Sequence, residues 1–163
     1  NLEIKNSTFL NAHLDSIDVD ISKNINFINL NIINSGNDGI DFMESEAKLK
    51  NIIFDNNGDK GVSVGENSKI IISDSVFKNN KTGLASKDAS LAIIKNSLFL
   101  NNETQINTYN KNWRYGASGK IEIIDSDFVA KENNINTDNE GQIKIINSKI
   151  TGKLKMKGNV LLN

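Results

Sequence analysis

Short runs of apolar, mostly β-branched residues recur along the chain, and polar residues separate them. Four clear examples are residues 69–77 (KIIISDSVF), 91–99 (LAIIKNSLF), 120–128 (KIEIIDSDF) and 142–150 (QIKIINSKI). Runs of this length that are rich in β-branched residues and bounded by polar turns are typical of β-strands. The pattern therefore predicts a succession of short strands and turns.

The runs repeat at a nearly constant interval. One series of large apolar residues consists of Phe9, Ile33, Phe54, Phe77, Phe99, Phe128 and Ile150. A second series consists of Ile17, Ile40, Val62, Leu84, Ile106, Ile135 and Leu154. Members of both series recur about 22 positions apart, as in a repeat architecture. The steps from Phe99 to Phe128 and from Ile106 to Ile135 are both 29 positions, longer than the others by the same amount, which indicates a single insertion.

A repeat of this length is too short to bury its own apolar face, so successive copies have to stack. Equivalent strands then pair in parallel, about 4.8 Å apart along the stacking axis. We therefore expect an all-β fold, a single right-handed parallel β-helix of about seven rungs that covers residues 1–163. Neither end shows a recognisable capping helix, and we expect the chain to be part of a longer protein.

Asparagine occurs 28 times, more often than isoleucine with 24, although it is usually depleted in strands. Polar residues stand three positions before most members of the first series: Asn6, Asn51, Asp74, Asn96, Asp125 and Asn147, with Leu30 as the exception. A further set stands two positions after it: Asn11, Ser35, Asn56, Asn79 and Asn101. We interpret both sets as ladders in which each side chain bonds its equivalent in the next rung.

A glycine precedes the second apolar series in three successive rungs, at Gly39, Gly61 and Gly83. Such a position indicates a sharp corner that needs either a positive φ or the absence of Cβ. The segments 66–68 and 88–90 follow with an acid, one other residue and a serine. Their side-chain oxygens are suited to accept hydrogen bonds from turn amides, so this repeated phrase is interpreted as structural.

Charge and composition exclude several classes of function. The 19 basic and 20 acidic side chains nearly cancel, which argues against binding to nucleic acid or to a membrane surface. No segment approaches the roughly 18 apolar residues of a membrane span, so we expect no membrane insertion. The chain contains no cysteine, so disulfides and thiolate metal sites are excluded and the cellular compartment stays open.

Four segments in order carry a resemblance to a known family: NDGIDF, DKGVSVGENS, GLASKDAS and YNKNWRYG. Across residues 36–119 the chain resembles the β-helix region that accompanies spore-coat-H-type kinase domains in bacterial envelope proteins. In fold it resembles the carbohydrate-associated, pectate-lyase-like β-helices. The resemblance implies an extracellular or cell-envelope location and a polysaccharide or surface-protein partner. The Asp-Pro-His-Glu motif of the epimerases is absent, because the chain has no proline.

An acidic patch is the first candidate site. In the expected register Asp15 stacks below Asp38, Asp18 stacks below Asp41, and Lys60 lies one rung above Asp38. Stacked carboxylates repel one another and favour a cation or a neighbouring lysine. Calcium, which takes several oxygen ligands, is one candidate cofactor for these four aspartates. The alternative is a solvated face with raised pKa values.

The insertion at residues 107–119 is the second candidate site. It contains Tyr109, Trp113, Arg114 and Tyr115, which include the only tryptophan and the only arginine of the chain. Insertions in solenoids often form a binding face. The rings are suited to a sugar and the guanidinium to a carboxylate or sulfate. The alternative is a loop that covers the flank, with the arginine packed on an aromatic ring.

Three classes of function follow. The first is a non-catalytic module that displays a binding face for carbohydrate or a partner protein. The second is a polysaccharide lyase or uronate epimerase in which Asp38 and Asp41 hold calcium, Lys60 or Lys87 is the base and Arg114 neutralises the uronate. The third is a structural spacer. The structural interpretation of Lys87 is a salt-bridge ladder in which Lys87 and Lys111 pair with the acidic residues 66 and 88.

Overall fold

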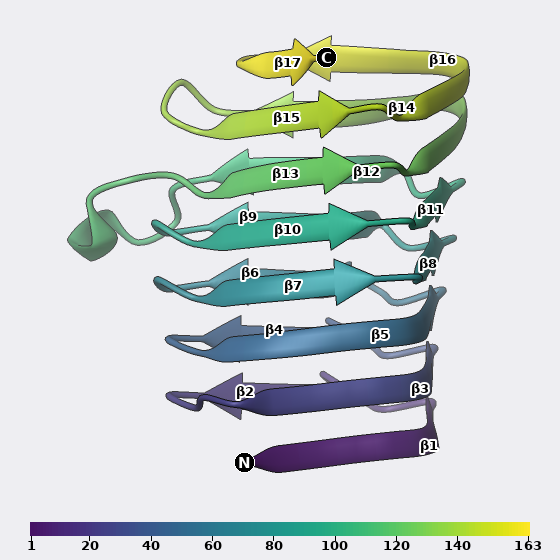
Figure 1. The fold of residues 1–163 in the computed structure, drawn as a ribbon, viewed down its shortest axis with the longest axis vertical. Helices are drawn as coiled ribbons and strands as arrows, with labels where there is room; N and C mark the ends of the chain where they lie inside the picture. The colour runs from purple at the N-terminus through teal and green to yellow at the C-terminus, as the bar shows by residue number, and fades with distance from the viewer.

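The computed structural model describes residues 1–163, which form one elongated parallel β-solenoid (Figure 1). The N-terminus lies at one end of the stack and the C-terminus at the other. Every strand pairing is parallel, and equivalent strands lie one above another. The prediction of an all-β parallel solenoid with about 7 turns and a period of about 22 residues is confirmed.

Each turn of the solenoid has three sides, which we call A, B and C. Side A consists of the first part of β1 (Leu2–Leu10), β3 (Ile25–Ile33) and β5 (Glu46–Asp55), then β7 (Lys69–Ser73), β10 (Leu91–Lys95), β13 (Lys120–Ile124), β15 (Gln142–Ile146) and β17 (Val160–Leu162). Side B consists of the second part of β1, β3 and β5, then β8 (Val76–Lys78), β11 (Leu98–Leu100) and the first part of β14 (Asp127–Thr137) and β16 (Lys149–Lys157).

Side C contains the remaining strands and leads into the insertion. It consists of β2 (Ile17–Asp20), β4 (Ile40–Met43), β6 (Lys60–Gly65), β9 (Thr82–Lys87), β12 (Thr104–Tyr109) and the second part of β14 and β16. The only helical segment, the 3-10 turn η1 (Trp113–Tyr115), lies in the loop between β12 and β13. That loop projects from the stack (Figure 1).

Aromatic and aliphatic side chains stack inside the solenoid in continuous columns. The rings of Phe54, Phe77, Phe99 and Phe128 follow one another with centroid distances of 4.9, 4.6 and 5.0 Å. All four rings are fully buried. Burying side chains of this size contributes about 1.5–3 kcal/mol each, so this column is a main source of stability.

The exposed asparagine ladder passes through the second rung, so its expected break at Leu30 is wrong. Phe9 pairs with Ile32 rather than with Ile33, so the ladder residue of the second rung is Asn29. The Asn29 amide nitrogen donates to Asn6 Oδ1 at 3.0 Å, and that of Asn51 donates to Asn29 Oδ1 at 2.8 Å. The same one-residue shift replaces Ser35 by Asn34 in the second predicted ladder. That ladder is wrong beyond Asn56, because the Asn79 side chain donates to Asp55 Oδ1 at 2.9 Å instead.

Backbone conformation explains why asparagine occupies these positions. Asn6, Asn29 and Asn51 have φ values of 52°, 56° and 54°, in the left-handed region that bends the strand from side A to side B. Asparagine tolerates this region better than most residues because its short side chain bonds locally. The asparagines therefore form the corners as well as the ladders.

Three ladders, one of asparagines and two of serines, lie on the inner side of the corners. Asn57 donates through its backbone and side-chain nitrogens to Asn80 Oδ1 at 3.0 and 2.8 Å, and Asn80 bonds Asn102 in the same way. Elsewhere a serine hydroxyl accepts from the backbone amide one rung below, as Ser90 does from Ser68 at 3.0 Å. These bonds satisfy amides that the turns leave unpaired.

The corner glycines are required for space and not for a positive φ. Gly39, Gly61 and Gly83 are absent from the residues with positive φ. A Cβ on Gly61 would lie 2.6 Å from the carbonyl oxygen of Gly83, and the same closeness holds for Gly39 against Gly61. The prediction of a missing Cβ is therefore confirmed, whereas the alternative of a positive φ is wrong.

The last turn departs from the regular register. A bulge follows Ala130, and Ile135 pairs with Met156 rather than with Leu154. The predicted second apolar series is therefore wrong at its final member. Lysines alternate with apolar residues in 153–157, so an apolar residue meets Ile135 whether Leu154 or Met156 pairs with it. The sequence pattern alone therefore does not decide between the two registers.

Candidate functional site

The outward side chains of side C form a surface that we call the side-C face. Side chains alternate across a strand, so every second residue of β4, β6, β9 and β12 points away from the core. Parallel pairing stacks these residues into two columns. The first column contains Asp41, Ser63, Ala85 and Asn107, and the second contains Met43, Gly65, Lys87 and Tyr109.

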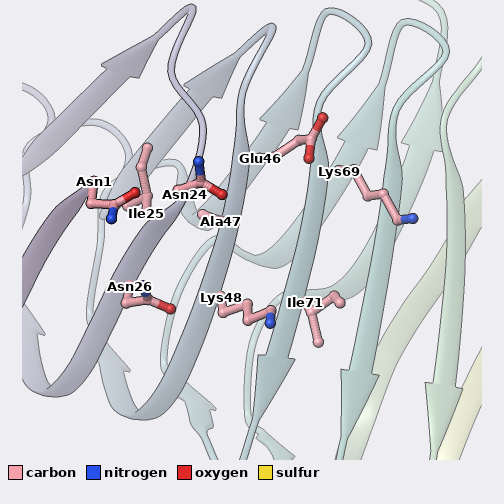
Figure 2. A pocket seen from close by; sticks show the side chains of 9 residues that line it. All are labelled: Asn1, Asn24, Ile25, Asn26, Glu46, Ala47, Lys48, Lys69 and Ile71. Carbon is pink, nitrogen blue, oxygen red and sulfur yellow. The ribbon is translucent and has the colours of Figure 1, made fainter.

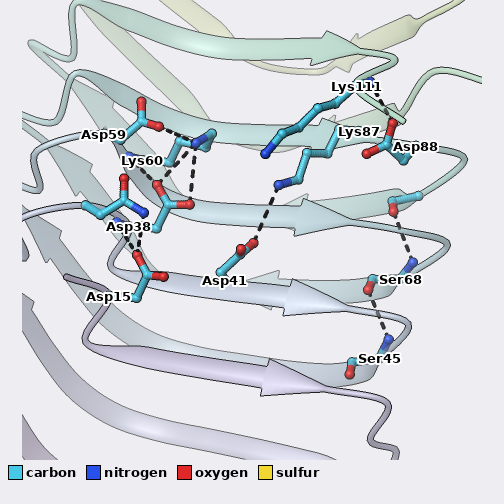
Figure 3. Close-up of polar contacts among 12 residues, drawn as sticks. Asp15, Asp38, Asp41, Ser45, Asp59, Lys60, Ser68, Lys87, Asp88 and Lys111 are labelled. Atoms are coloured by element: carbon cyan, nitrogen blue, oxygen red, sulfur yellow. Dashed lines mark hydrogen bonds and ion pairs between the residues drawn. The ribbon is translucent and has the colours of Figure 1, made fainter. Parts of the chain in front are cut away.

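A lysine between two aspartates lies where the chain enters side C. Lys60 Nζ is 3.2 Å from Asp38 Oδ1 and also contacts the carboxylate of Asp59 (Figure 3). The side chains of Lys60 and Asp38 are only 12% and 3% exposed, so this is a buried ion pair. The expected position of Lys60 one rung above Asp38 is confirmed by the Lys60 amide, which donates to Asp38 Oδ1 at 3.0 Å.

Burial and charge act in opposite directions on this pair. Burial raises the pKa of Asp38, although the charge of Lys60 opposes the rise. Burial alone would lower the pKa of Lys60, but the hydrogen bond to Asp59 and the charge of Asp38 raise that pKa above its usual range. Lys60 is therefore protonated at neutral pH, which disfavours it as a general base.

The predicted acidic stack forms at its expected register. Asp18 pairs directly with Asp41, and Asp15 Oδ1 accepts from the backbone amide of Asp38 at 2.7 Å. Burial raises the pKa of Asp18, and the charges of Asp20, Asp41 and Asp15 raise it further.

No group of three or more histidine, cysteine, aspartate or glutamate side chains is arranged to bind a metal ion. Asp15 Oδ1 also accepts from the Asn37 side chain, at 2.8 Å, so this oxygen already has two donors. The assignment of calcium to Asp15, Asp18, Asp38 and Asp41 stays a prediction.

Lys87 lies across the side-C face toward the acidic stack. Its Nζ is 3.8 Å from Asp41 Oδ1, and its side chain is 4% exposed (Figure 3). The stem of Lys87 passes over Gly65, where a Cβ would lie 2.5 Å from Lys87 Cε. The expected ladder of Lys87 and Lys111 with Glu66 and Asp88 is wrong, because Lys87 pairs with Asp41 instead.

Two polar atoms beside Lys87 have no hydrogen-bond partner. They are Asp41 Oδ1 and the hydroxyl of Ser63, which is fully buried. Tyr109 is half-buried; burial raises its pKa, and the positive charges of Lys60 and Lys87 oppose the rise. The face therefore brings together two lysines, a tyrosine and a serine beside the aspartates. The sequence had indicated both lysines as candidate bases there, whereas Tyr109 and Ser63 were not expected at this place.

The inserted loop is fixed to the solenoid at both of its ends. The backbone amides of Lys111 and Asn112 each donate to Asp88 Oδ1 at 2.7 Å. Asp138 accepts from the Asn110 amide at 2.9 Å and from the Ser118 hydroxyl at 2.6 Å. The loop therefore starts and ends on hydrogen-bonded anchors in neighbouring rungs.

The tip of the loop exposes the only tryptophan. Trp113 is 81% exposed, and the Arg114 guanidinium carbon lies 6.0 Å from the centroid of its ring. Tyr115 reaches back to the second rung, where its hydroxyl donates to Glu44 Oε1 at 2.8 Å. The predicted group of four therefore divides: Trp113, Arg114 and Tyr115 share the loop, whereas Tyr109 is the last residue of β12 and lies on the side-C face.

A shallow groove on side A was not expected from the sequence. It has a volume of about 460 Å³ and lies over the first turns (Figure 2). Its lining consists of Asn1, Asn24, Ile25, Asn26, Glu46, Ala47, Lys48, Lys69 and Ile71. These residues come from four rungs. The one sign of the groove in the sequence is that Lys48 and Ile71, which pair in adjacent strands, both occupy outward positions.

Parallel stacked strands with inward aliphatic columns and asparagine corners have a counterpart among known families. The family model described as "Right handed beta helix region" matches residues 1–161. The chain belongs to the right-handed β-helix family. No curated protein and no solved structure shows a significant match. No helix of this β-helix protein has the length and apolar character needed to cross a membrane.

Proposed function

We propose that this β-helix protein is a non-catalytic, extracytoplasmic module that uses its inserted loop to bind carbohydrate. The observation that carries the proposal is Trp113, which stays 81% exposed on a loop anchored at both ends. Aromatic side chains of this size are usually buried, so an exposed one indicates an interaction site. The resemblance to β-helices of bacterial envelope proteins supports the extracytoplasmic location.

Preorganisation supports binding rather than simple cover of the flank. The Asn112 side chain accepts from the Arg114 amide at 3.2 Å, and Gly116 closes the turn with a φ of 70°. A loop held in this way loses little conformational entropy when a ligand binds. The Trp113 ring offers an apolar face for a sugar, and Arg114 beside it offers hydrogen-bond donors for oxygen atoms.

A second candidate function is the calcium-assisted polysaccharide lyase or epimerase. It is favoured by the convergence of Lys60, Lys87 and Tyr109 with Asp38 and Asp41 on one outer face. The raised pKa of Lys60 opposes its use as a base, so Lys87 is the better candidate. Incubation with uronate polymers, with and without calcium, tests this function by the ultraviolet absorbance of unsaturated products.

Fluorescence tests the carbohydrate proposal directly, because Trp113 is the only tryptophan of the chain. Titration with a panel of neutral and acidic polysaccharides is expected to shift its emission in a saturable way. Calorimetry on Trp113→Ala should show at least a tenfold loss of affinity for the same polysaccharide. The matched control Leu14→Ala removes another exposed apolar side chain, 66% exposed, and should leave binding unchanged.

Two outcomes would overturn the proposal. A panel without any saturable response would leave a structural spacer or a protein-binding module. Binding that Trp113→Ala does not weaken would place the carbohydrate elsewhere on the solenoid, with the side A groove as the next surface to test.

A further inference from the structure

Charge is distributed unevenly along the axis of the solenoid. Residues 1–76 carry 12 acidic and 6 basic side chains, whereas residues 77–163 carry 8 acidic and 13 basic ones. The net charge of the whole chain is only −1, so the two halves nearly cancel. Because equivalent residues stack rung upon rung, this asymmetry in sequence becomes an electrostatic dipole along the rod (Figure 1).

On the side-C face, acidic residues lie at one end of a column of outward side chains and basic residues lie at the other end. β2 at one end exposes Asp18 and Asp20, and β16 at the other end exposes Lys155 and Lys157. None of these four side chains takes part in an ion pair within the chain. From one end to the other the column consists of Asp18, Asp41, Ser63, Ala85, Asn107, Asn136 and Lys157.

This column is complementary to itself when it is reversed. Its central position is Ala85, and turning a second copy end for end about that position places Asp18 opposite Lys157. In the same arrangement Asp41 lies opposite Asn136, and no like charges meet along this column. In the second column Lys87 lies at the two-fold position, but its side chain is only 4% exposed and its charge is paired with Asp41 of its own copy. Adjacent rungs are about 4.8 Å apart, so the two charged ends of the column are separated by about 29 Å.

We propose that two copies of the chain associate side by side and antiparallel through the side-C face. In this dimer Asp18 of each copy faces Lys157 of the other, and Asp20 and Lys155 flank this contact. The same patch is used by both copies, as in any interface with two-fold symmetry. The dimer does not depend on the carbohydrate-binding proposal.

An end-to-end arrangement fits less well. It also brings the acidic first rung next to the lysine-rich last rung. However, β17 adds a strand to side A only, so the last turn is one strand higher on that side than on sides B and C. A second first rung could not pair with all three sides at once, whereas the lateral arrangement leaves both ends free.

Charge rather than apolar area holds this dimer together. Ser63 and Ala85 in the middle of the column are already fully buried within their own copy, so they add no new contact area. The attraction comes from the two charged ends, each exposed and screened by salt. Association is therefore strongest at low ionic strength and should be lost in about 1 M salt, where the Debye length is about 3 Å.

Dimerisation has a consequence for the inserted loops. The two-fold axis runs perpendicular to both rods, parallel to the side-C strands, so it keeps the loop-bearing edge of each copy on the same side. Each dimer then presents two Trp113 rings along one edge. Two linked sites bind a repeating polymer more tightly than one site does.

Charge reversal followed by analytical ultracentrifugation tests the proposal. One variant carries Asp18→Lys and Asp20→Lys, and the other carries Lys155→Asp and Lys157→Asp. Each variant alone should be monomeric at a salt concentration at which the wild type is dimeric. An equimolar mixture of the two variants should regain the dimer, because the lysines at both ends of one face then meet aspartates at both ends of the other.

Controls separate this result from misfolding and from a general charge effect. Circular dichroism checks that each variant keeps its β-structure. A dimer that forms again in the mixture is further evidence of folding, because only folded variants can associate in this way. Glu3→Lys and Lys95→Asp change charge on side A and should leave the dimer intact. A monomeric wild type at low salt would overturn the proposal, as would variants that still dimerise alone. Species that grow beyond two copies would overturn it in favour of the end-to-end arrangement.

Discussion

Lys87 on β9 reaches past β6 and places its ammonium 3.8 Å from Oδ1 of Asp41 on β4. The two residues are 46 positions apart in the sequence, and only the stacking of rungs brings them together. Gly65, in the strand between them, provides the space for the lysine stem. Gly65 therefore serves a single ion pair, unlike the corner glycines Gly39, Gly61 and Gly83.

Adding one methyl group at Gly65 should displace Lys87. The Cβ of Gly65→Ala would lie 2.5 Å from Lys87 Cε, so the flexible side chain has to leave its place over β6. We expect a loss of about 1 kcal/mol in the free energy of unfolding, a typical size for a point substitution. Mass spectrometry after mild acylation should show faster labelling of Lys87, with Lys23, already 70% exposed, as the unchanged reference. Unaltered labelling of Lys87 would contradict the proposed path of its side chain.

Two adjacent asparagines should differ sharply in their contribution to stability. Asn80→Ala leaves the backbone and side-chain nitrogens of Asn57 without their acceptor inside the solenoid, which should cost about 3 kcal/mol or more. Asn79→Ala removes only an exposed bond to Asp55 and places alanine at a φ of 57°, which should cost about 1 kcal/mol. Urea unfolding of both variants measures the difference. Equal losses would contradict the separation into a buried and an exposed ladder.

The stacking of rungs, the core residues and the polar corner residues could be predicted from the sequence, because each of these features recurs with a nearly constant period. The phenylalanine column shows this well, since Phe54, Phe77 and Phe99 recur one period apart and do stack. The prediction of the register was wrong where two neighbouring residues are equally apolar. Ile32 and Ile33 both fit the pattern, and only the ladder bond of Asn29 to Asn6 decides between them.

The candidate site was predictable in position but not in its contacts. The pairing of Asp18 with Asp41 and the place of Lys60 above Asp38 follow from register alone. Lys87 was different, because a long side chain can extend along the rod past its nearest neighbours. Its partner depends on rotamers and on free space, and neither is encoded in the period of the sequence.

A strained corner in the first rung offers a stabilising substitution. Ile21 has a φ of 48° and is 72% exposed, so it bears the cost of a left-handed conformation without any gain from burial. Isoleucine is especially disfavoured there because of its β-branched side chain. Ile21→Asn should raise the free energy of unfolding by about 1 kcal/mol. Leu14→Asn, an exposed position without a positive φ, is the control and should change stability little. A gain of the same size at both positions would point to removal of apolar surface instead.

Acid should loosen the anchor of the inserted loop. Partial burial opposes ionisation of Asp138, but the Ser118 hydroxyl and the Gly141 amide donate to it and lower its pKa below the ordinary value of an aspartate. A carboxyl with a lowered folded pKa adds stability above its unfolded pKa, and this stability is lost as the pH falls through the folded value.

Asp138→Asn tests this anchor. The variant should melt about 2–4 °C below the wild type at neutral pH, as expected for a loss of about 1 kcal/mol. The difference should shrink as the pH falls below about 4, where the wild-type carboxylate becomes protonated. A difference that stays constant with pH would mean that the charge of Asp138 does not contribute.

Disulfide trapping tests most directly the central claim that residues one period apart are vertical neighbours. Val76 and Leu98 pair in adjacent strands and both point outward, and the chain has no cysteine of its own. Val76→Cys with Leu98→Cys should form a disulfide under mild oxidation, because adjacent strands are about 4.8 Å apart. Val76→Cys with Asp127→Cys, two rungs apart, should not form one within the chain. Failure of the first pair, or equal trapping of both, would contradict the stacked register on which the site and the dimer depend.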